Sequence, residues 1–316
     1  MGEDECCVKL EGIHHITAIT GDAQKNVDFY AGVMGLRLVK KTVNQDDPTV
    51  YHLFFADEKG DAGSDLTFFE YPGAPPGRAG EGMIWGIRWR LGTAEALDFW
   101  EKRLAEHGTE AERGDDDVIR FADPEGLGHA LKVVETTDEP LIAEHPEIPS
   151  EMALQGFDGA IAHASSPEAS RPLLEEALGF EPTTESDGRG WECRGDRRGG
   201  LWGYSEPPAG RGLQGAGSVH HIAWASQMDD HEAWRERVIA AGARPTPVID
   251  RFYFRSIYFR EPSGVLFEIA TLGPGFTVDE PLESLGEKLS LPPDYEHLRE
   301  QVEPVLRPIQ NPRVHA

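Results

Sequence analysis

Apolar and polar positions along the chain form one pattern that occurs four times. In its first occurrence, a stretch that alternates like a strand at residues 12–20 is followed by a helical pattern at 23–35. Three further strand-like stretches follow within residues 37–72, separated by Gly, Asp and Pro turns. This order predicts a unit of one strand, one helix and three more strands.

The same order of patterns recurs, more weakly, in three later units of about 50 to 60 residues. The second unit covers residues 83–135, with an amphipathic helix at 94–108 that ends in Gly108. The third unit has an expected strand at 156–164, a helix at 167–180 and a Gly-rich end near 207. The fourth unit has a strand at 218–226, a helix at 228–243 and further strands within 248–271. The fold class predicted is therefore α+β, built from four βαβββ modules.

The length of 316 residues fits two domains or one tandemly built unit. A Pro- and Glu-rich stretch at 136–154 reads as a linker between the halves. We therefore expect an N-terminal domain at 8–137, a C-terminal domain at 152–275 and a tail at 276–316. In the tail, Leu298, Val302 and Leu306 have helical spacing and predict a short helix that covers a groove.

Thirty basic and fifty-six acidic residues give a net charge of −26. Such a charge repels phosphate backbones and anionic membranes, so nucleic acid and membrane partners are not expected. Acid spread evenly along the chain suggests a salt-adapted, halophilic surface, with an ordinary acidic cytosolic protein as the alternative. Neither a signal peptide nor a run of about 18 apolar residues occurs. With no disulfide framework among Cys6, Cys7 and Cys193, a cytoplasmic protein is expected.

Two histidine doublets interrupt apolar strands at equivalent places in the first and fourth units, in "GIHHITAIT" and "SVHHIAWAS". The middle units carry Trp85-Gly86 and Asp158-Gly159 there. The stretches "DPEGLGHALKV" and "EPSGVLFEIAT" share an acid-Pro-x-Gly turn, and their superposition puts Ala130 of the second unit where Glu268 stands; Thr67 is the counterpart in the first. A site made of His, His and Glu therefore requires the outer units to meet.

A carboxylate buried in an apolar strand is costly without a partner, and a cation would resolve this together with the doublets. Two imidazoles and one carboxylate with open positions form the triad that non-haem Fe(II) oxygenases use. Mn(II) fits as well, and Zn(II) tolerates the same ligands. Successive strand residues face opposite sides of a sheet, so one histidine of each doublet is expected to bind, but parity alone does not choose between His14 and His15.

The chain resembles the vicinal oxygen chelate (glyoxalase/bleomycin resistance/dioxygenase) superfamily, and more narrowly its ring-cleaving dioxygenases that open para-hydroquinones. The resemblance is carried by the stretch from Gly12 to Asp57, by "VHHIAWAS" and by "DRFYFRSIYFREPSGVLFEIAT". The resemblance implies two vicinal oxygen chelate domains with open barrel-like sheets. It implies His15, His221 and Glu268 as Fe(II) ligands. It also implies Thr17, His220, Arg251 and Tyr258 as catalytic residues around the metal.

The function expected is thus Fe(II)-dependent ring cleavage, with a small dihydroxylated aromatic and O₂ as partners and a possible homo-oligomer as the assembly. Two alternatives are a glyoxalase-type metal-dependent isomerase or lyase, and a non-catalytic protein that binds an aromatic ligand. The isomerase expects a fourth protein ligand, which neither Thr67 nor Ala130 provides. Three other features are interpreted as having no chemical role: Cys193, the Gly-rich stretch 210–217, and the strand histidines His52 and His163.

Overall fold

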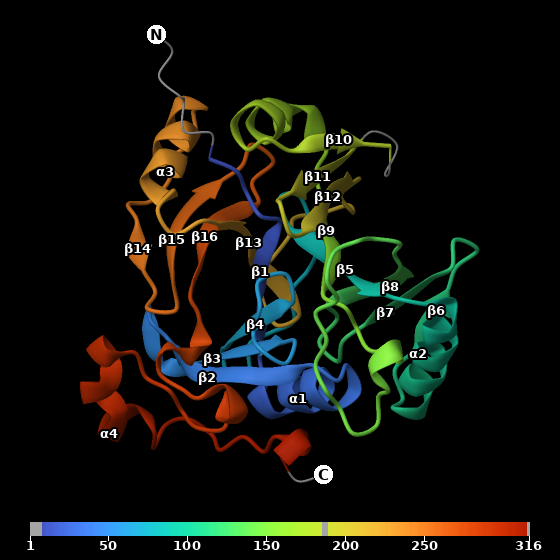
Figure 1. Ribbon diagram of the computed structural model, residues 1–316, viewed down its shortest axis with the longest axis vertical. Helices are drawn as coiled ribbons and strands as arrows, with labels where there is room; N and C mark the ends of the chain where they lie inside the picture. The colour runs from blue at the N-terminus through green and yellow to red at the C-terminus, as the bar shows by residue number, and fades with distance from the viewer. Residues whose placement is uncertain (1–7, 185–188, 315–316) are drawn as a thin grey trace.

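The computed structural model describes residues 8–184 and 189–314. Cys6 and Cys7, which were predicted to form no disulfide framework, lie outside these residues. Its sixteen numbered strands form two eight-stranded sheets (Figure 1). The first sheet has the order β14-β15-β16-β13-β1-β4-β3-β2. Its strands are β1 (Ile13–Thr20), β2 (Arg37–Asn44), β3 (Asp47–Ala56), β4 (Asp65–Glu70), β13 (Ser218–Ser226), β14 (Ile249–Asp250), β15 (Phe254–Arg260) and β16 (Leu266–Pro274).

The second sheet has the order β10-β11-β12-β9-β5-β8-β7-β6. Its strands are β5 (Ile84–Leu91), β6 (Ala111–Arg113), β7 (Val118–Ala122), β8 (Gly128–Val133), β9 (Phe157–His163), β10 (Glu181–Thr183), β11 (Gly190–Arg194) and β12 (Gly199–Ser205). The α+β class and the four-module plan are therefore confirmed. The first sheet joins the first and fourth modules, and the second sheet joins the second and third, so each sheet takes half of its strands from either side of the linker.

The helices differ more than the strands from the sequence-based expectation. The second and fourth modules carry the α-helices α2 (Ala94–Glu106) and α3 (His231–Ala240). In the first module, α1 (Ala23–Val27) passes into π-helical turns at Asp28–Val33, and the third module has a 3₁₀ turn at Pro167–Ala169 and a π-helical turn at Leu173–Ala177. Hydrophobic periodicity predicts that a helical segment covers the sheet, but it does not distinguish these wider and tighter windings. No helix among the described residues is long and apolar enough to cross a membrane.

A β-bulge lies at every doublet. Along the pairing of β1 with β13, Ile13 faces Trp224 and His15 faces Ala223, so His14 is an extra residue; His220 is the extra residue on the other strand. The pairing of β5 with β9 shows the same shifts at Trp85 and Asp158. Because a bulge interrupts the alternation of side chains, the premise of strict alternation fails here, and the two rings of each doublet lie together.

The acid-Pro-x-Gly turns tie the two sheets together. Asp123 accepts hydrogen bonds from two amides of its own turn and from the Tyr30 hydroxyl of the first module, at 2.9 Å. Glu261 likewise accepts amides of its own turn and the hydroxyls of Tyr204 and Ser170 from the third module. The motif that marks the end of a module thus fastens it to the module before it in sequence, which lies in the other sheet.

The buried ring of His129 belongs to the same network as Tyr30. Trp89 donates its indole N–H to Nδ1 at 3.0 Å, and Nε2 lies 2.9 Å from the Tyr30 hydroxyl. Burial lowers the pKa of His129 to about 3. The hydrogen bonds also suit the neutral ring, because a proton on Nδ1 would face the indole N–H of Trp89. The folded state therefore favours the neutral ring, and its stabilising contribution, complete above the unfolded pKa of about 6.5, falls as pH decreases towards 3.

We expect this one histidine to remove about 2 kcal/mol of stability between pH 7.5 and pH 5. Urea unfolding at the two pH values measures it. His129→Gln should be less stable than the parent at pH 7.5 but should lack this part of the acid sensitivity. An equal loss of unfolding free energy in the parent and the variant would contradict the assignment.

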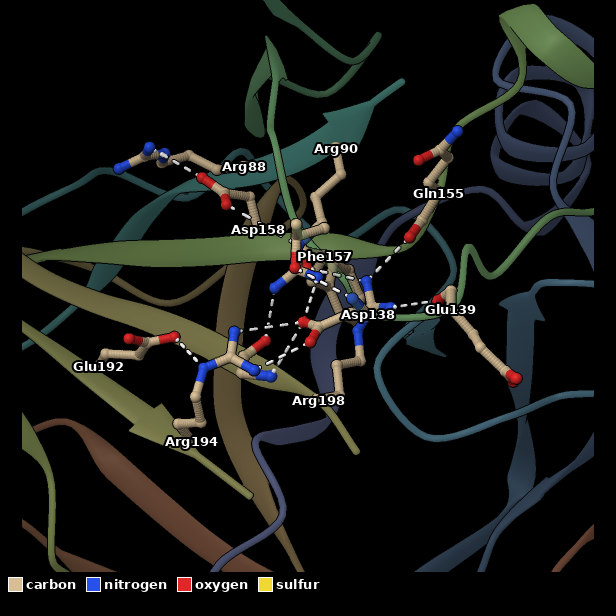
Figure 2. Close-up of polar contacts among 12 residues, drawn as sticks. Arg88, Arg90, Asp138, Glu139, Gln155, Phe157, Asp158, Glu192, Arg194 and Arg198 are labelled. Carbon is tan, nitrogen blue, oxygen red and sulfur yellow. Dashed lines mark hydrogen bonds and ion pairs between the residues drawn. The ribbon is translucent and has the colours of Figure 1, made fainter. Parts of the chain in front are cut away.

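The linker is held against the second sheet by a cluster of arginines (Figure 2). Asp138 receives Arg90 at 2.6 Å and Arg194 at 2.8 Å. Arg198 donates to the backbone carbonyls of Glu139, Gln155 and Phe157. The linker is therefore attached to the second sheet by ion pairs and hydrogen bonds.

The tail after β16 lies against the outer strands β2 and β3 of the first sheet, below them in Figure 1. The fully buried ammonium of Lys40 on β2 binds the carboxylates of Asp279, at 2.7 Å, and Glu280. Further along, the predicted helix consists of 3₁₀ turns at Pro293–Leu298 followed by α4 (Arg299–Val302). The Tyr295 hydroxyl donates to the carbonyl of Gln45 at 2.9 Å. The tail thus supports the β2–β3 hairpin.

Candidate metal centre

Three ligand-type side chains from three strands of the first sheet converge. His15 comes from β1, His221 from β13 and Glu268 from β16, and their nearest ligand atoms lie within 4.8 Å of one another. Nε2 of His15 lies 3.2 Å and Nε2 of His221 lies 2.9 Å from Oε2 of Glu268, and the two Nε2 atoms are 3.3 Å apart. All three side chains are buried. The fold therefore brings together the His, His and Glu of the two outer modules.

Glu268 is fully buried, and its two oxygens have different surroundings. Ser256 donates a short hydrogen bond to Oε1. Oε2 accepts no hydrogen bond of acceptable geometry although both imidazoles are near it. Burial alone would raise the pKa of Glu268, but the electrostatic interaction with His15 and His221 outweighs it and holds the pKa well below its ordinary value. An ionised oxygen left without a donor, facing two ring nitrogens, is the arrangement that suits a divalent cation.

The bulge residues His14 and His220 determine which nitrogens of His15 and His221 carry a proton and which point at Glu268. Nε2 of His14 lies 3.0 Å from the carbonyl of Thr271, and its Nδ1 lies 2.9 Å from Nδ1 of His15. The carbonyl requires the His14 proton on Nε2, so His15 donates from Nδ1 and keeps the lone pair of Nε2. Nδ1 of His220 lies 2.8 Å from Nδ1 of His221 and suits the same assignment. Fixing a ligand's tautomer through its other nitrogen is a common outer-shell device at metal sites.

A pocket lined in part by His15 and His221 opens onto the triad. Tyr258 lines it and is the register partner of Glu268 across β15 and β16. Burial raises the pKa of Tyr258, so its hydroxyl stays protonated and can donate. Arg251 also lines the pocket, with Nε 3.4 Å from the Tyr258 hydroxyl. Thr17 lies deeper, fully buried, and its hydroxyl is 2.8 Å from that of Thr67.

His220 stands apart from the other predicted catalytic residues. It is exposed on the edge of the doublet and is not among the residues that line the pocket. Although the residue is partly exposed, desolvation of its ring, with the neighbouring His221 as the next cause, lowers its pKa to about 4. The neutral ring at pH 7 is therefore placed to accept a hydrogen bond from His221.

His52 is a pocket residue that sequence reasoning interpreted as structural. Its Nε2 lies 2.9 Å from the Thr67 hydroxyl, and its ring packs between those of Phe54 and Phe69 at centroid distances of 4.0 and 4.4 Å. Burial holds its pKa well below the ordinary value, so the ring is neutral. The spacing of His52 and Phe54 along β3 indicates that their side chains share one face of the strand. Nothing in the sequence shows that this face lies opposite the triad.

The remaining candidates lie away from the triad. Cys193 is buried, and burial raises its pKa to about 12, so its thiol is unreactive. His163 stacks on Trp85 in the second sheet. Residues 210–217 lie in a loop before β13 and open no helix. None of the three contributes a residue to the pocket.

The second sheet repeats the geometry of the first without its chemistry. Gly86 and Gly159 follow the bulges where His15 and His221 stand in the first sheet. Arg88 faces Ala130 there, as Thr17 faces Thr67 in the first sheet, and it forms an ion pair with Asp158 at 2.8 Å (Figure 2). The second sheet is therefore a scaffold at the place where the first sheet carries the triad.

These features define a class of protein. The sequence profile of the Glyoxalase/Bleomycin resistance protein/Dioxygenase superfamily matches residues 12–128 and 160–269. The chain belongs to this superfamily, as its doublets and closing strands indicate.

Individual relatives are similar over nearly the whole chain. The chain is 44% identical over 308 residues to "Putative ring-cleaving dioxygenase MhqO" of Bacillus subtilis (strain 168), covering 96% of this chain and 97% of the relative. It is 31% identical over 333 residues to "Chlorohydroquinone/hydroquinone 1,2-dioxygenase" of Sphingobium indicum, covering 97% and 98%. A solved structure of a "putative dioxygenase" from Bacillus subtilis has a TM-score of 0.89 at 42% identity, covering 96% of this chain and 98% of that one. Glyoxalase I from Zea mays, at 14% identity and a TM-score of 0.56, shares the fold alone.

Proposed function

We propose that the protein is a non-haem Fe(II)-dependent ring-cleaving dioxygenase that acts on a hydroquinone or a related dihydroxylated aromatic. The observation that carries this proposal is the convergence of His15, His221 and Glu268 beneath an open pocket, with Oε2 of Glu268 lacking a hydrogen bond. The named activities of the similar ring-cleaving dioxygenases support it. Mn(II) suits the same ligands, and Zn(II) also accepts them.

The cation would be held by Nε2 of each histidine and by the carboxylate of Glu268. When bound, Fe(II) supplies adjacent coordination positions for a phenolate oxygen and O₂ and a route for electrons between them. Both atoms of O₂ end in the ring-opened product, so the reaction needs no external reductant. The protein's own task is to orient the ring and to hold protons where oxygen atoms gain or lose charge.

Three residues of the pocket suit that task. The Tyr258 hydroxyl stays protonated and can donate to an oxygen near Glu268. The Arg251 guanidinium, with Nε near the same hydroxyl, favours the oxygen that carries negative charge. Thr17 anchors the hydroxyl chain from Thr67 to His52 beneath the ring site.

The walls of the pocket suit a flat aromatic ring. The rings of Phe54, Phe69 and Phe254 line it, together with that of Tyr253. Aromatic side chains pack against aromatic ligands with a preference for stacked or edge-on geometry. A pocket that combines several aromatic rings with polar side chains is typical of a site for a small ligand.

A glyoxalase-type isomerase is the second candidate among enzymes. It expects a fourth protein ligand on the strand equivalent to β16, and that position in the first module is occupied by Thr67. The Thr67 hydroxyl is engaged with Thr17 and His52. A non-catalytic aromatic binder would have no use for a buried carboxylate whose unsatisfied oxygen faces two imidazoles.

Oxygen uptake tests the proposal. Protein reconstituted anaerobically with Fe(II) and then given a hydroquinone should consume one O₂ per ring opened, in both low and high salt. Catechols serve as the comparison substrates, and Zn(II)-loaded protein is the control because Zn(II) does not change redox state. Absence of uptake with every dihydroxybenzene, together with isomerase activity under Zn(II) or Ni(II), would refute it.

A further inference from the structure

An ion pair spans the mouth of the pocket. Asp46 lies at the tip of the β2–β3 hairpin, and Arg251 follows β14 in the fourth module. Nη1 and Nη2 of Arg251 lie 3.3 and 3.1 Å from the two carboxylate oxygens of Asp46, a two-point contact. Both residues line the pocket, so the pair joins the outer modules at the entrance to the triad.

Every nitrogen of this guanidinium is engaged. Nε faces the Tyr258 hydroxyl, and the other two nitrogens face Asp46. Within the described part of the chain, Arg251 is the one arginine or lysine that lines the pocket. His52 is neutral because burial depresses its pKa. Asp46 therefore occupies both terminal nitrogens of the single fixed cation at the mouth, and only Nε, beside the Tyr258 hydroxyl, remains for the reaction.

The pair does not depend on its own attraction to stay in place. Asp46 is 74% exposed, and an isolated pair this exposed would contribute little. Here the hairpin tip is held separately: Gln45 donates Nε2 to the carbonyl of Arg251 at 2.8 Å, and Tyr295 of the tail donates to the carbonyl of Gln45. The backbone amide of Asp46 donates to Oδ1 of Asn44. These neighbouring contacts already fix the hairpin tip, so forming the ion pair costs little additional conformational entropy.

We propose that Asp46 is a specificity-determining residue, which makes the pocket select uncharged dihydroxylated rings and reject rings that carry a carboxylate. This inference rests on the proposed function and narrows its substrate class. A ring carboxylate entering the mouth meets a like charge on Asp46, and it finds Arg251 occupied. Selection by a repulsive group against the unwanted ligand is a general route to specificity.

Exchanging the charge at this one position tests the proposal. In Asp46→Asn, Arg251 is released and the repulsion removed, so kcat/KM for 2,5-dihydroxybenzoate relative to 2-methylhydroquinone should rise about tenfold or more, mainly through a lower KM for the anion. In the parent protein, the preference for the uncharged ring should weaken between 0.1 and 2 M NaCl, because salt screens an exposed charge. The variant should show little of this salt dependence.

Asp47→Asn is the matched control. It removes the same charge from the same hairpin tip, but Asp47 binds Thr49 rather than Arg251. Its substrate ratio should stay that of the parent. If Asp46→Asn leaves the ratio unchanged, or if both variants change it equally, the inference is overturned.

Failure of the proposed function gives a different result. The parent protein would then consume no O₂ with either compound, and the inference would be tested by anaerobic calorimetry with the same two ligands. Tighter binding of 2,5-dihydroxybenzoate in Asp46→Asn, but not in Asp47→Asn, would support it. Equal affinities in the three proteins would overturn it.

Discussion

Replacing Glu268 with glutamine should leave a folded protein that no longer retains a divalent metal. Glutamine keeps the volume of the side chain and can still accept the Ser256 hydroxyl, but it removes the charge that the cation requires. We expect affinity for Fe(II) or Mn(II) to fall by more than about 100-fold, beyond the effect typical of residues that only orient a ligand. Metal content after gel filtration and competition with a chelator measure this.

The unfolding free energy separates this effect from misfolding. Without metal, Glu268→Gln should still unfold in one cooperative transition but be less stable than the parent at pH 7, since a pKa held below the ordinary value means that the ionised carboxylate of Glu268 favours the folded state. Adding metal should stabilise the parent alone. Glu261→Gln is the control, because it neutralises an equally buried glutamate that binds Ser170 and Tyr204. Full metal occupancy in Glu268→Gln would refute the triad.

Tyr258→Phe should keep the metal and lose turnover by about 10²-fold or more, within the range of positioned acid–base groups. The ring still packs edge-on against His221, at a centroid distance of 5.7 Å, so the ligand stays in place. Only the protonated hydroxyl beside Arg251 is removed. Steady-state oxygen uptake at full metal loading measures the loss.

Tyr253→Phe is the matched control for this substitution. Tyr253 also lines the pocket, but its hydroxyl donates to Asp279 at 2.9 Å, away from the triad. Its loss should affect stability more than kcat. Equal loss of kcat in both variants would show that Tyr258 acts through packing.

The sequence predicts the repeated unit and the chemistry of the outer modules because both depend on local patterns. Alternation locates the strands, and Glu268 stands out because it breaks an apolar run. The relation of Thr67 and Ala130 to Glu268 also follows from aligned turns, and the registers of β4, β8 and β16 agree with it. Assignment of the ligands to His15 and His221 came from family resemblance, and it stays a prediction until metal is measured.

Other features escape sequence reasoning because they arise from pairing between distant segments. The bulges at His14 and His220 appear only when β1 and β13 pair. They replace the parity argument with a physical reason for each doublet: one ring points at Glu268, and the other is placed to fix its tautomer. The contact between Asp46 and Arg251 joins residues about 200 positions apart, and no local sequence pattern predicts it.

The order of the strands also has a consequence for biosynthesis. β1 pairs on one side with β4 of its own module, but its other partner, β13, begins at Ser218. The roughly 150 residues between Glu70 and Ser218 take about 7 to 30 s to translate at common ribosome speeds. During that time the nascent chain carries an apolar edge strand with unpaired amides, which is the kind of edge that invites pairing with another molecule. The His15, His221 and Glu268 cluster can therefore form only after the fourth module has been synthesised, and exchange of that module between two neighbouring nascent chains would complete the same sheet in an intertwined dimer.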